Sequence, residues 1–379
     1  MRSSVSLSPA ASTPVPSAVP EELLHGRDVE VFPLLAEHAH EQVSFSYEPS
    51  SGYRGIIAIH DTTLGPALGG TRFGTYQNDR EALVDVLRLS RGMTYKAAVA
   101  GLNVGGGKSV MIGDNKTTRR EPLFRAHGRH IESLGGRYIT AEDVGTSTGD
   151  MAHIHAETRY VTGLIGKSGD PSPVTAYGVY RGMKACARHV YGSDSLAGKT
   201  VAIQGVGHVG YALAQLLHRE GAKLVVSDID PARVQRVVDE MHAEAAAPDA
   251  IYGARADIFA PCALGGIIND QTIPLLKARI VAGGANNQLG EERHGDELER
   301  RGIVYAPDFA INSGGLINVY AEWNGWSPDR ARHKAGEIYD TILRVFEIAA
   351  EEGVPSYRAA DRLAEQRITM VAKVRNNFG

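Results

Sequence analysis

The stretch Thr200-Val-Ala-Ile-Gln-Gly-Val-Gly-His-Val-Gly210 decides the fold. Its first half predicts a short buried strand, and its second half matches the Gly-x-Gly-x-x-Gly pattern of dinucleotide-binding turns. A helical segment beginning at Tyr211 follows directly. A strand, a glycine turn and a helix in this order present backbone N–H groups and a helix N-terminus to a pyrophosphate. The residues expected at this turn are Gly205, Gly207, Val209 and Gly210.

A second predicted strand, Leu224-Val-Val-Ser, ends at Asp228, close to 20 residues after the glycine turn. A carboxylate at this place accepts hydrogen bonds from ribose hydroxyls and repels a 2′-phosphate. Asp230 adds further negative charge, and no arginine follows at once. The pattern therefore favours NAD over NADP. A different Rossmann ligand such as FAD, or a glycine turn without a ligand, is the alternative.

Further along the chain, short apolar runs at 257–261, 280–282 and 303–306 alternate with helical segments. This alternation is typical of an α/β fold with a doubly wound parallel sheet. Upstream, the patterns predict strands at 55–60, 110–112 and 137–140 and helices at 79–93 and 122–134. The Pro-rich cluster at 170–174 is expected to end a first domain, and a helix is expected from about Thr175 to His189. Amphipathic segments at 328–350 and 356–372 close the chain.

Length and composition set the broad class. A chain of 379 residues is long enough for two domains, and its net charge of −4 gives no reason to expect nucleic acid or an anionic membrane as a partner. Two distant cysteines, Cys186 and Cys262, argue against a disulfide framework and favour a reducing cytoplasm. No apolar run approaches the length of a membrane span. Residues 1–28, rich in Ser, Pro and Ala, are expected to form a disordered tail.

A second glycine-rich stretch, Gly101-Leu-Asn-Val-Gly-Gly-Gly-Lys-Ser109, resembles a phosphate-binding loop but does not match it. That motif needs a glycine five positions before Gly107, where this chain has Leu102. We therefore interpret the stretch as a glycine loop that mounts a buried lysine, Lys108. A lysine that works as a base near neutral pH must lose its proton easily, and burial and a neighbouring cation such as Lys96 both promote this.

Further motifs occur in a fixed order around these two stretches. They are Asp61-Thr-Thr-Leu-Gly-Pro-Ala-Leu-Gly-Gly-Thr-Arg72, Arg91-Gly-Met-Thr-Tyr-Lys96, Thr140-Ala-Glu-Asp-Val-Gly145, Pro171-Ser-Pro-Val-Thr-Ala-Tyr-Gly178, Ala260-Pro-Cys-Ala-Leu-Gly-Gly266, Gly284-Ala-Asn-Asn-Gln-Leu289 and Ile311-Asn-Ser-Gly-Gly-Leu-Ile-Asn318. Together they resemble the glutamate/leucine/phenylalanine/valine dehydrogenase superfamily, and the leucine dehydrogenase branch most closely, over roughly residues 30–370.

The resemblance implies NAD-dependent, reversible oxidative deamination of an L-amino acid to a 2-oxo acid and ammonium. It also implies a homo-oligomer, of which an octamer is one form. A substrate-binding and oligomerisation domain is expected at 29–173 plus about 335–379. A cleft would separate it from an NAD-binding domain at 174–334.

The resemblance also implies roles for individual residues. Lys108 would be the catalytic lysine, and Asp143 would exchange protons with the substrate amine. Lys96 would bind the substrate carboxylate, helped by backbone N–H groups near Gly69 and Gly70. The cofactor side is expected to include Ala260, Pro261, Cys262, Asn286 and Asn287, with the two asparagines near the nicotinamide or the amine.

By the same resemblance, the substrate side chain would contact Leu68, Ala141, Leu316 and Val319. All four are apolar, and an acidic side chain buried among them would lack a partner at a cost of several kcal/mol. Leu68 and Ala141 fit a branched-chain substrate, namely leucine, valine or isoleucine. Leu316 departs from the branched-chain pattern, because aromatic-preferring relatives often carry leucine there. Phenylalanine or tryptophan is therefore the alternative substrate.

Other interpretations remain for single residues and for the whole chain. Asp143 could instead cap a helix, and Lys96 and Lys108 could be ordinary surface lysines. His153 and His155 lie two positions apart, on different faces of a helix, so no metal site is expected. A hydroxy-acid dehydrogenase would need a catalytic histidine, which no matching motif supplies. A non-catalytic NAD-binding regulator would not need Lys96, Lys108 and Asp143.

Overall fold

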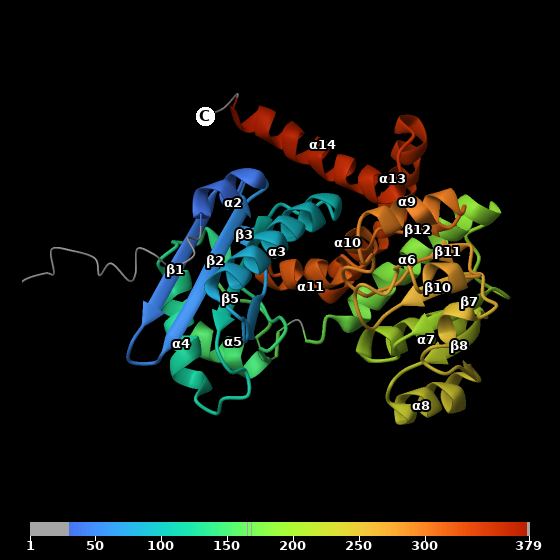
Figure 1. Ribbon diagram of the computed structural model, residues 1–379, viewed down its shortest axis with the longest axis horizontal. Coiled ribbons are helices and arrows are strands. Elements are labelled where there is room, and N and C mark those ends of the chain that lie inside the picture. The colour runs from blue at the N-terminus through green and yellow to red at the C-terminus, as the bar shows by residue number, and fades with distance from the viewer. Residues whose placement is uncertain (1–29, 165, 168, 377–379) are drawn as a thin grey trace, which may run out of the picture.

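The computed structural model describes residues 30–164, 166–167 and 169–376. The chain forms two lobes, each built on its own β-sheet, and it crosses from the first lobe to the second just before helix α6 (Ser172–Tyr191) (Figure 1). The tail predicted for residues 1–28 lies outside the described residues.

The second lobe contains the parallel sheet that the sequence predicts. Its strands lie in the order β12 (Val304–Tyr305), β11 (Ile280–Val281), β10 (Ile258–Pro261), β7 (Thr200–Gln204), β8 (Lys223–Ser227) and β9 (Glu244–Ala245). This is the strand order of a dinucleotide-binding Rossmann fold, which confirms the predicted fold class. The helices of this lobe include α6, α7 (His208–Glu220), α8 (Pro231–Met241), α9 (Arg293–Arg300) and the short 3₁₀ turns at Ile251–Gly253 and Ile273–Leu275.

The first lobe contains a mixed sheet in the order β1 (Gln42–Glu48), β2 (Tyr53–Asp61), β5 (Gly105–Ile112), β3 (Ala67–Leu68) and β6 (Tyr138–Ile139), with β4 (Thr71–Gly74) also paired to β5. Its helices are α2 (Val31–Glu37), α3 (Asp79–Val99), α4 (Arg120–Glu132) and α5 (Thr148–His155). Helix α3 starts where predicted, capped by the Asn78 side chain. It continues past the predicted end at residue 93, and therefore carries Lys96 in its last turn.

The predicted glycine loop is wrong, because Gly105, Gly106 and Gly107 all lie in strand β5. The glycines are needed there for close packing. A Cβ on Gly105 would lie 2.0 Å from the Asp61 carbonyl oxygen, and a Cβ on Gly106 would lie 2.1 Å from the Thr94 nitrogen in helix α3. Lys108 therefore projects from a central strand rather than from a loop.

The remaining helices are α10 (Asp308–Ile311), α11 (Gly314–Trp323), α12 (Pro328–Gly336), α13 (Ile338–Glu352) and α14 (Ser356–Asn376). The single segment predicted at 328–350 is thus two helices that part at Glu337. Helix α13 packs on α6, whereas α14 returns to the first lobe and packs across α3 (Figure 1). There the Arg367 guanidinium donates to the carbonyls of Ala97, Ala98 and Leu102. Across the described ranges, no helix combines the length and the apolar character that a membrane span requires.

Candidate active site between the lobes

A cleft of about 450 Å³ lies where residues from both halves of the chain meet. It brings together the predicted catalytic pair with all the predicted substrate-binding residues and part of the cofactor set. These residues are Leu68, Gly69, Gly70, Lys96, Lys108, Ala141, Asp143, Val209, Asn286, Asn287, Leu316 and Val319. The fold thus gathers in one cleft residues that are up to about 250 positions apart in the chain.

Lys108 and Asp143 form an ion pair on the first-lobe wall of the cleft. The Lys108 Nζ lies 2.7 Å from Asp143 Oδ2, and the two side chains are only 7% and 23% exposed. The backbone N–H of Asp143 donates to the Thr146 hydroxyl, which fixes the turn that presents the carboxylate. Burial alone would raise the pKa of Asp143, but the cations Lys108 and Arg72 outweigh it and leave the pKa below its usual range. Asp143 is therefore ionised and can accept a proton.

Gly69 and Gly70 bring the chain between β3 and β4 into close contact with its neighbours. A Cβ on Gly69 would lie 1.8 Å from the Gly107 carbonyl oxygen, and one on Gly70 would lie 2.4 Å from the Glu142 carbonyl oxygen. Both positions thus exclude any side chain. As a result, bare backbone lines the cleft beside Lys108.

Lys96 reaches the cleft from the last turn of α3. Its Nζ donates to Asn286 Oδ1 at 3.4 Å and so links the first lobe to the second. Burial, together with the nearby Lys108 cation, lowers the pKa of Lys96 to about 8, although Asp308 and Asp143 act in the opposite direction. The sequence analysis assigned Lys96 as the carboxylate-binding residue and as a cation beside Lys108, but it did not anticipate this shift in the pKa of Lys96 itself.

Asp308 and Asn312 complete the second-lobe wall and were missed by the sequence analysis. Asp308 Oδ2 accepts a hydrogen bond from the Gln288 backbone N–H at 2.8 Å, just after Asn287 adopts a left-handed backbone with φ of 50°. The Asn312 amide donates to Asn286 Oδ1 at 2.8 Å. These contacts fix both asparagines. A lone aspartate such as Asp308 is too weak a signal to single out, and Asn312 stood within the motif at 311–318 without being assigned a role.

The glycine turn of the second lobe has the shape that a dinucleotide requires. Gly205 has φ of 92°, and a Cβ on Gly210 would lie 1.9 Å from the Gly205 carbonyl oxygen. Gly207 precedes helix α7, and a Cβ there would be in ordinary van der Waals contact with the Arg233 guanidinium, at 3.8 Å. Asp228 Oδ2 accepts a hydrogen bond from the Val206 N–H at 2.8 Å. These residues fit a dinucleotide with its pyrophosphate at the start of α7.

The other predicted cofactor residues follow the same sheet edge. Ala260 and Pro261 end strand β10, and the Cys262 N–H donates to the Gln204 carbonyl at the end of β7. Ligands of open α/β sheets bind at the carboxyl ends of the strands.

The sequence analysis did not identify Arg233 of helix α8. Its guanidinium lies 3.9 Å from the Asp228 carboxylate and 3.4 Å from the Asp230 carboxylate, so these two groups offset its positive charge. In the described part of the chain, no group of His, Cys, Asp or Glu residues could hold a metal ion.

Comparison with known proteins agrees with this geometry. The dimerisation-domain model of the Glu/Leu/Phe/Val dehydrogenases matches residues 39–160, and the second model of that family matches 166–232 and 229–376. The chain belongs to this family. It is an amino-acid dehydrogenase that uses NAD.

Individual relatives cover nearly the whole chain. The leucine dehydrogenase of Thermoactinomyces intermedius is 59% identical over 92% of this dehydrogenase and 96% of its own length. The valine dehydrogenase of Streptomyces albus is 48% identical over 87% of this chain and 92% of its own. The crystal structure of L-tryptophan dehydrogenase from Nostoc punctiforme superposes with a TM-score of 0.83 at 47% identity, covering 90% of this chain and 99% of that one.

The place of Asp228 leads to a test of cofactor choice. Replacing Asp228 with alanine is expected to raise KM for NAD by about 10- to 100-fold, because a hydrogen bond to a charged group contributes roughly 1.5–3 kcal/mol. The KM for NADP should fall or stay constant, because Arg233 loses a competing carboxylate. Initial rates with both cofactors measure this, with Asp239→Ala on the exposed side of α8 as the control. An unchanged NAD-to-NADP preference would contradict the role of Asp228.

Proposed function

We propose that this dehydrogenase catalyses the reversible oxidative deamination of a branched-chain L-amino acid to its 2-oxo acid and ammonium. The observation that carries the proposal is the Lys108–Asp143 ion pair at 2.7 Å, set in a cleft beside buried apolar side chains. An acid–base pair next to an apolar pocket suits the amine chemistry of an apolar amino acid.

Each residue then has a defined task. Lys96, with the backbone N–H groups near Gly69 and Gly70, binds the substrate carboxylate. Asp143 takes a proton from the substrate ammonium, and Lys108 moves protons through water during hydrolysis of the imine and carbinolamine. The turn at Gly205–Gly210 would hold NAD, which would supply the hydride acceptor for the substrate α-carbon. Asn286 and Asn287 orient the reacting groups from the second lobe.

The substrate preference follows from the walls of the pocket. Leu68, Ala141 and Leu316 are between 1% and 6% exposed, so a side chain packed against them is desolvated. The leucine and valine dehydrogenases among the relatives support a branched-chain substrate. An aromatic substrate is the second candidate, favoured by Leu316 and by the likeness to L-tryptophan dehydrogenase.

Reductive amination across a panel of 2-oxo acids tests the proposal. With NADH and ammonium, we expect kcat/KM for 4-methyl-2-oxopentanoate to exceed that for phenylpyruvate by about 10-fold or more, since pocket fit is worth roughly 1–3 kcal/mol. The value for 2-oxoglutarate should be lower still, because its second carboxylate would be buried unpaired. A preference for phenylpyruvate would support the aromatic alternative, and a preference for 2-oxoglutarate would overturn both. Turnover without ammonium would instead indicate a hydroxy-acid dehydrogenase.

We further propose a first domain of residues 29–173 plus helix α14, and an NAD-binding domain that runs from residue 174 through helix α13, because α13 packs on α6 and α14 packs on α3. The return to the first domain expected at about residue 335 is therefore placed at Ser356 instead. We also propose a homo-oligomeric assembly such as an octamer and a cytoplasmic location. The oligomer is supported by the dimerisation-domain model that matches residues 39–160. It is also supported by the edge strand β1, which exposes Phe45 and Tyr47 at 54% and 66%. Light scattering of the purified full chain measures the assembly, and a monomer would contradict it.

A further inference from the structure

Arg72 in strand β4 lies between two carboxylates, and only one of them belongs to the proposed catalytic pair. Its Nε donates to Asp143 Oδ2 at 3.3 Å, and its Nη1 donates to Asp85 Oδ2 at 2.9 Å. Both Arg72 and Asp85 are largely buried, with 26% and 15% of their side chains exposed. A continuous chain of charges therefore runs from Lys108 through Asp143 and Arg72 to Asp85.

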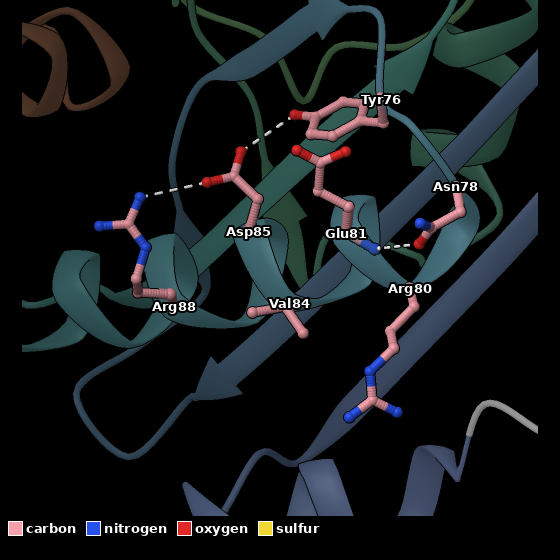
Figure 2. A pocket seen from close by; sticks show the side chains of 7 residues that line it. All are labelled: Tyr76, Asn78, Arg80, Glu81, Val84, Asp85 and Arg88. Atoms are coloured by element: carbon pink, nitrogen blue, oxygen red, sulfur yellow. Dashed lines mark hydrogen bonds and ion pairs between the residues drawn. The ribbon is translucent and has the colours of Figure 1, made fainter.

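The far end of this chain is anchored in the N-terminal half of α3. Figure 2 shows Tyr76 and Arg88 reaching the Asp85 carboxylate from opposite sides. The Tyr76 hydroxyl donates to Asp85 Oδ2 at 3.0 Å, and the Arg88 guanidinium donates to Asp85 Oδ1 at 3.2 Å. Asp85 is thus held in place by Tyr76 and by Arg88 at the edge of the cleft, neither of which has a task in the proposed reaction, and Asp85 in turn holds the Arg72 guanidinium.

The same oxygen of Asp143 accepts from both Lys108 and Arg72, so the two cations share one atom. If Arg72 were free of Asp85, it could turn both of its donor groups to Asp143 and form the two-point pair that guanidinium groups prefer with carboxylates. Such a pair would hold the carboxylate more tightly and compete with Lys108 and with an incoming substrate ammonium. Asp85 prevents this by engaging the Nη1 end of Arg72.

We propose that Arg72 is a positioning residue that sets the charge and orientation of Asp143, and that Asp85 limits how strongly Arg72 binds that carboxylate. The proposal deepens the proposed function and rests on it. Helix α3 carries both Asp85 and Lys96, so one rigid element would fix the carboxylate-binding lysine and the regulator of the proton acceptor together.

The pH dependence of deamination distinguishes this proposal from a purely structural role. Besides Lys108 and Arg72, the groups that act on or feel the charge of Asp143 are Lys96 of α3, Tyr138 of β6 and Tyr76 after β4. Removing a cation makes every neighbouring group hold its proton more tightly. In a plot of kcat/KM against pH, the fall in rate on the acid side (the acid limb) should therefore occur at higher pH in Arg72→Met, whichever neighbouring group causes that fall.

The experiment compares kcat/KM for the amino acid against pH, at saturating NAD, in matched variants. For Arg72→Met, we expect the midpoint of the acid limb to move to higher pH by about one unit. For Asp85→Ala, we expect the midpoint of the acid limb to move to lower pH, because Arg72 then binds Asp143 alone. We also expect KM for the amino acid to increase several-fold. Arg72→Lys keeps the cation and should restore most of the wild-type limb. Arg80→Met is the control, because Arg80 lines the same surface pocket as Asp85 but its side chain points away from the charge chain (Figure 2).

Opposite shifts in Arg72→Met and Asp85→Ala support the inference. The inference is overturned if the acid limb moves in the same direction in both variants, or if the rates fall while the acid limb stays at its wild-type pH. Thermal melting of each variant shows whether it is folded, and Arg72→Lys provides the comparison if Arg72→Met does not fold. Absence of deamination in the wild-type enzyme would refute the proposed function before any variant is made, so the two failures are distinguishable.

Discussion

Replacing Lys108 with alanine is expected to reduce kcat for oxidative deamination by about 10²- to 10⁴-fold, the usual contribution of a general acid–base group. The Lys108 Nζ, projecting from β5, lies 2.7 Å from the Asp143 carboxylate. Without it, Asp143 retains Arg72 but the cleft loses the group that moves protons to and from water. Formation of NADH under saturating amino acid and NAD measures the effect.

Three measurements make the Lys108 result interpretable. Binding of NAD to the variant should stay near the wild-type value, because the glycine turn at Gly205–Gly210 lies in the other lobe. Lys116→Ala, an exposed lysine in the segment after β5, should leave kcat unchanged. Thermal melting should show a folded protein. If folded Lys108→Ala kept kcat within a few-fold of the wild type, the proposed mechanism would be wrong.

Replacing Gly106 with alanine is expected to destabilise the first lobe by about 3 kcal/mol or more, the upper range for an overpacked core. The added Cβ would lie 2.1 Å from the Thr94 nitrogen and 2.6 Å from the Ser90 carbonyl oxygen. Both atoms belong to the backbone of α3, so no rotamer change relieves the contact. Either the helix moves away from β5, which separates Lys96 from Lys108, or the lobe does not fold.

Differential scanning calorimetry measures the loss as a fall in Tm of the order of 10 °C for a lobe of this size. Gly74→Ala is the matched control, since Gly74 also lies in a strand of the same sheet but a Cβ added there would have nothing within 4 Å. It should melt with the wild type. Equal melting temperatures for Gly106→Ala and Gly74→Ala would show that α3 does not pack on β5 as closely as described.

The glycine-rich stretch at 101–109 shows where sequence reasoning succeeded and where it stopped. Three glycines before Lys108 correctly indicated close backbone approach and a buried lysine. They did not indicate a strand, because glycine disfavours strands and such a run is typical of loops. The stretch forms a strand because it pairs with β2, and its glycines are required because helix α3 and the end of β2 at Asp61 leave no room for side chains. That crowding comes from segments distant in the chain.

In the proposed active site too, some residues could be assigned from the sequence and others could not. Residues in strong local patterns, such as Gly205–Gly210 and Asp228, could be assigned with their geometry, because a strand, turn and helix form a self-contained unit. Lys96 and Asp143 could be named through the family resemblance, but not their surroundings. Asp308 was missed, because a lone aspartate at a helix start usually only caps the helix. Asn312, at the end of α10, was missed because its motif marked the family without giving this residue a role.

By itself, the sequence determined the doubly wound NAD-binding lobe and the family, because local periodicity and short motifs encode these features directly. Through the family resemblance it also named most of the residues that meet in the cleft, but not Asp308 and Asn312. Only the tertiary structure placed the glycine run in a central strand, gave Lys96 its lowered pKa, and joined Arg72 to Asp143 and Asp85. These features depend on distances between charges and backbones from separate elements, and such distances exist only after the elements have packed.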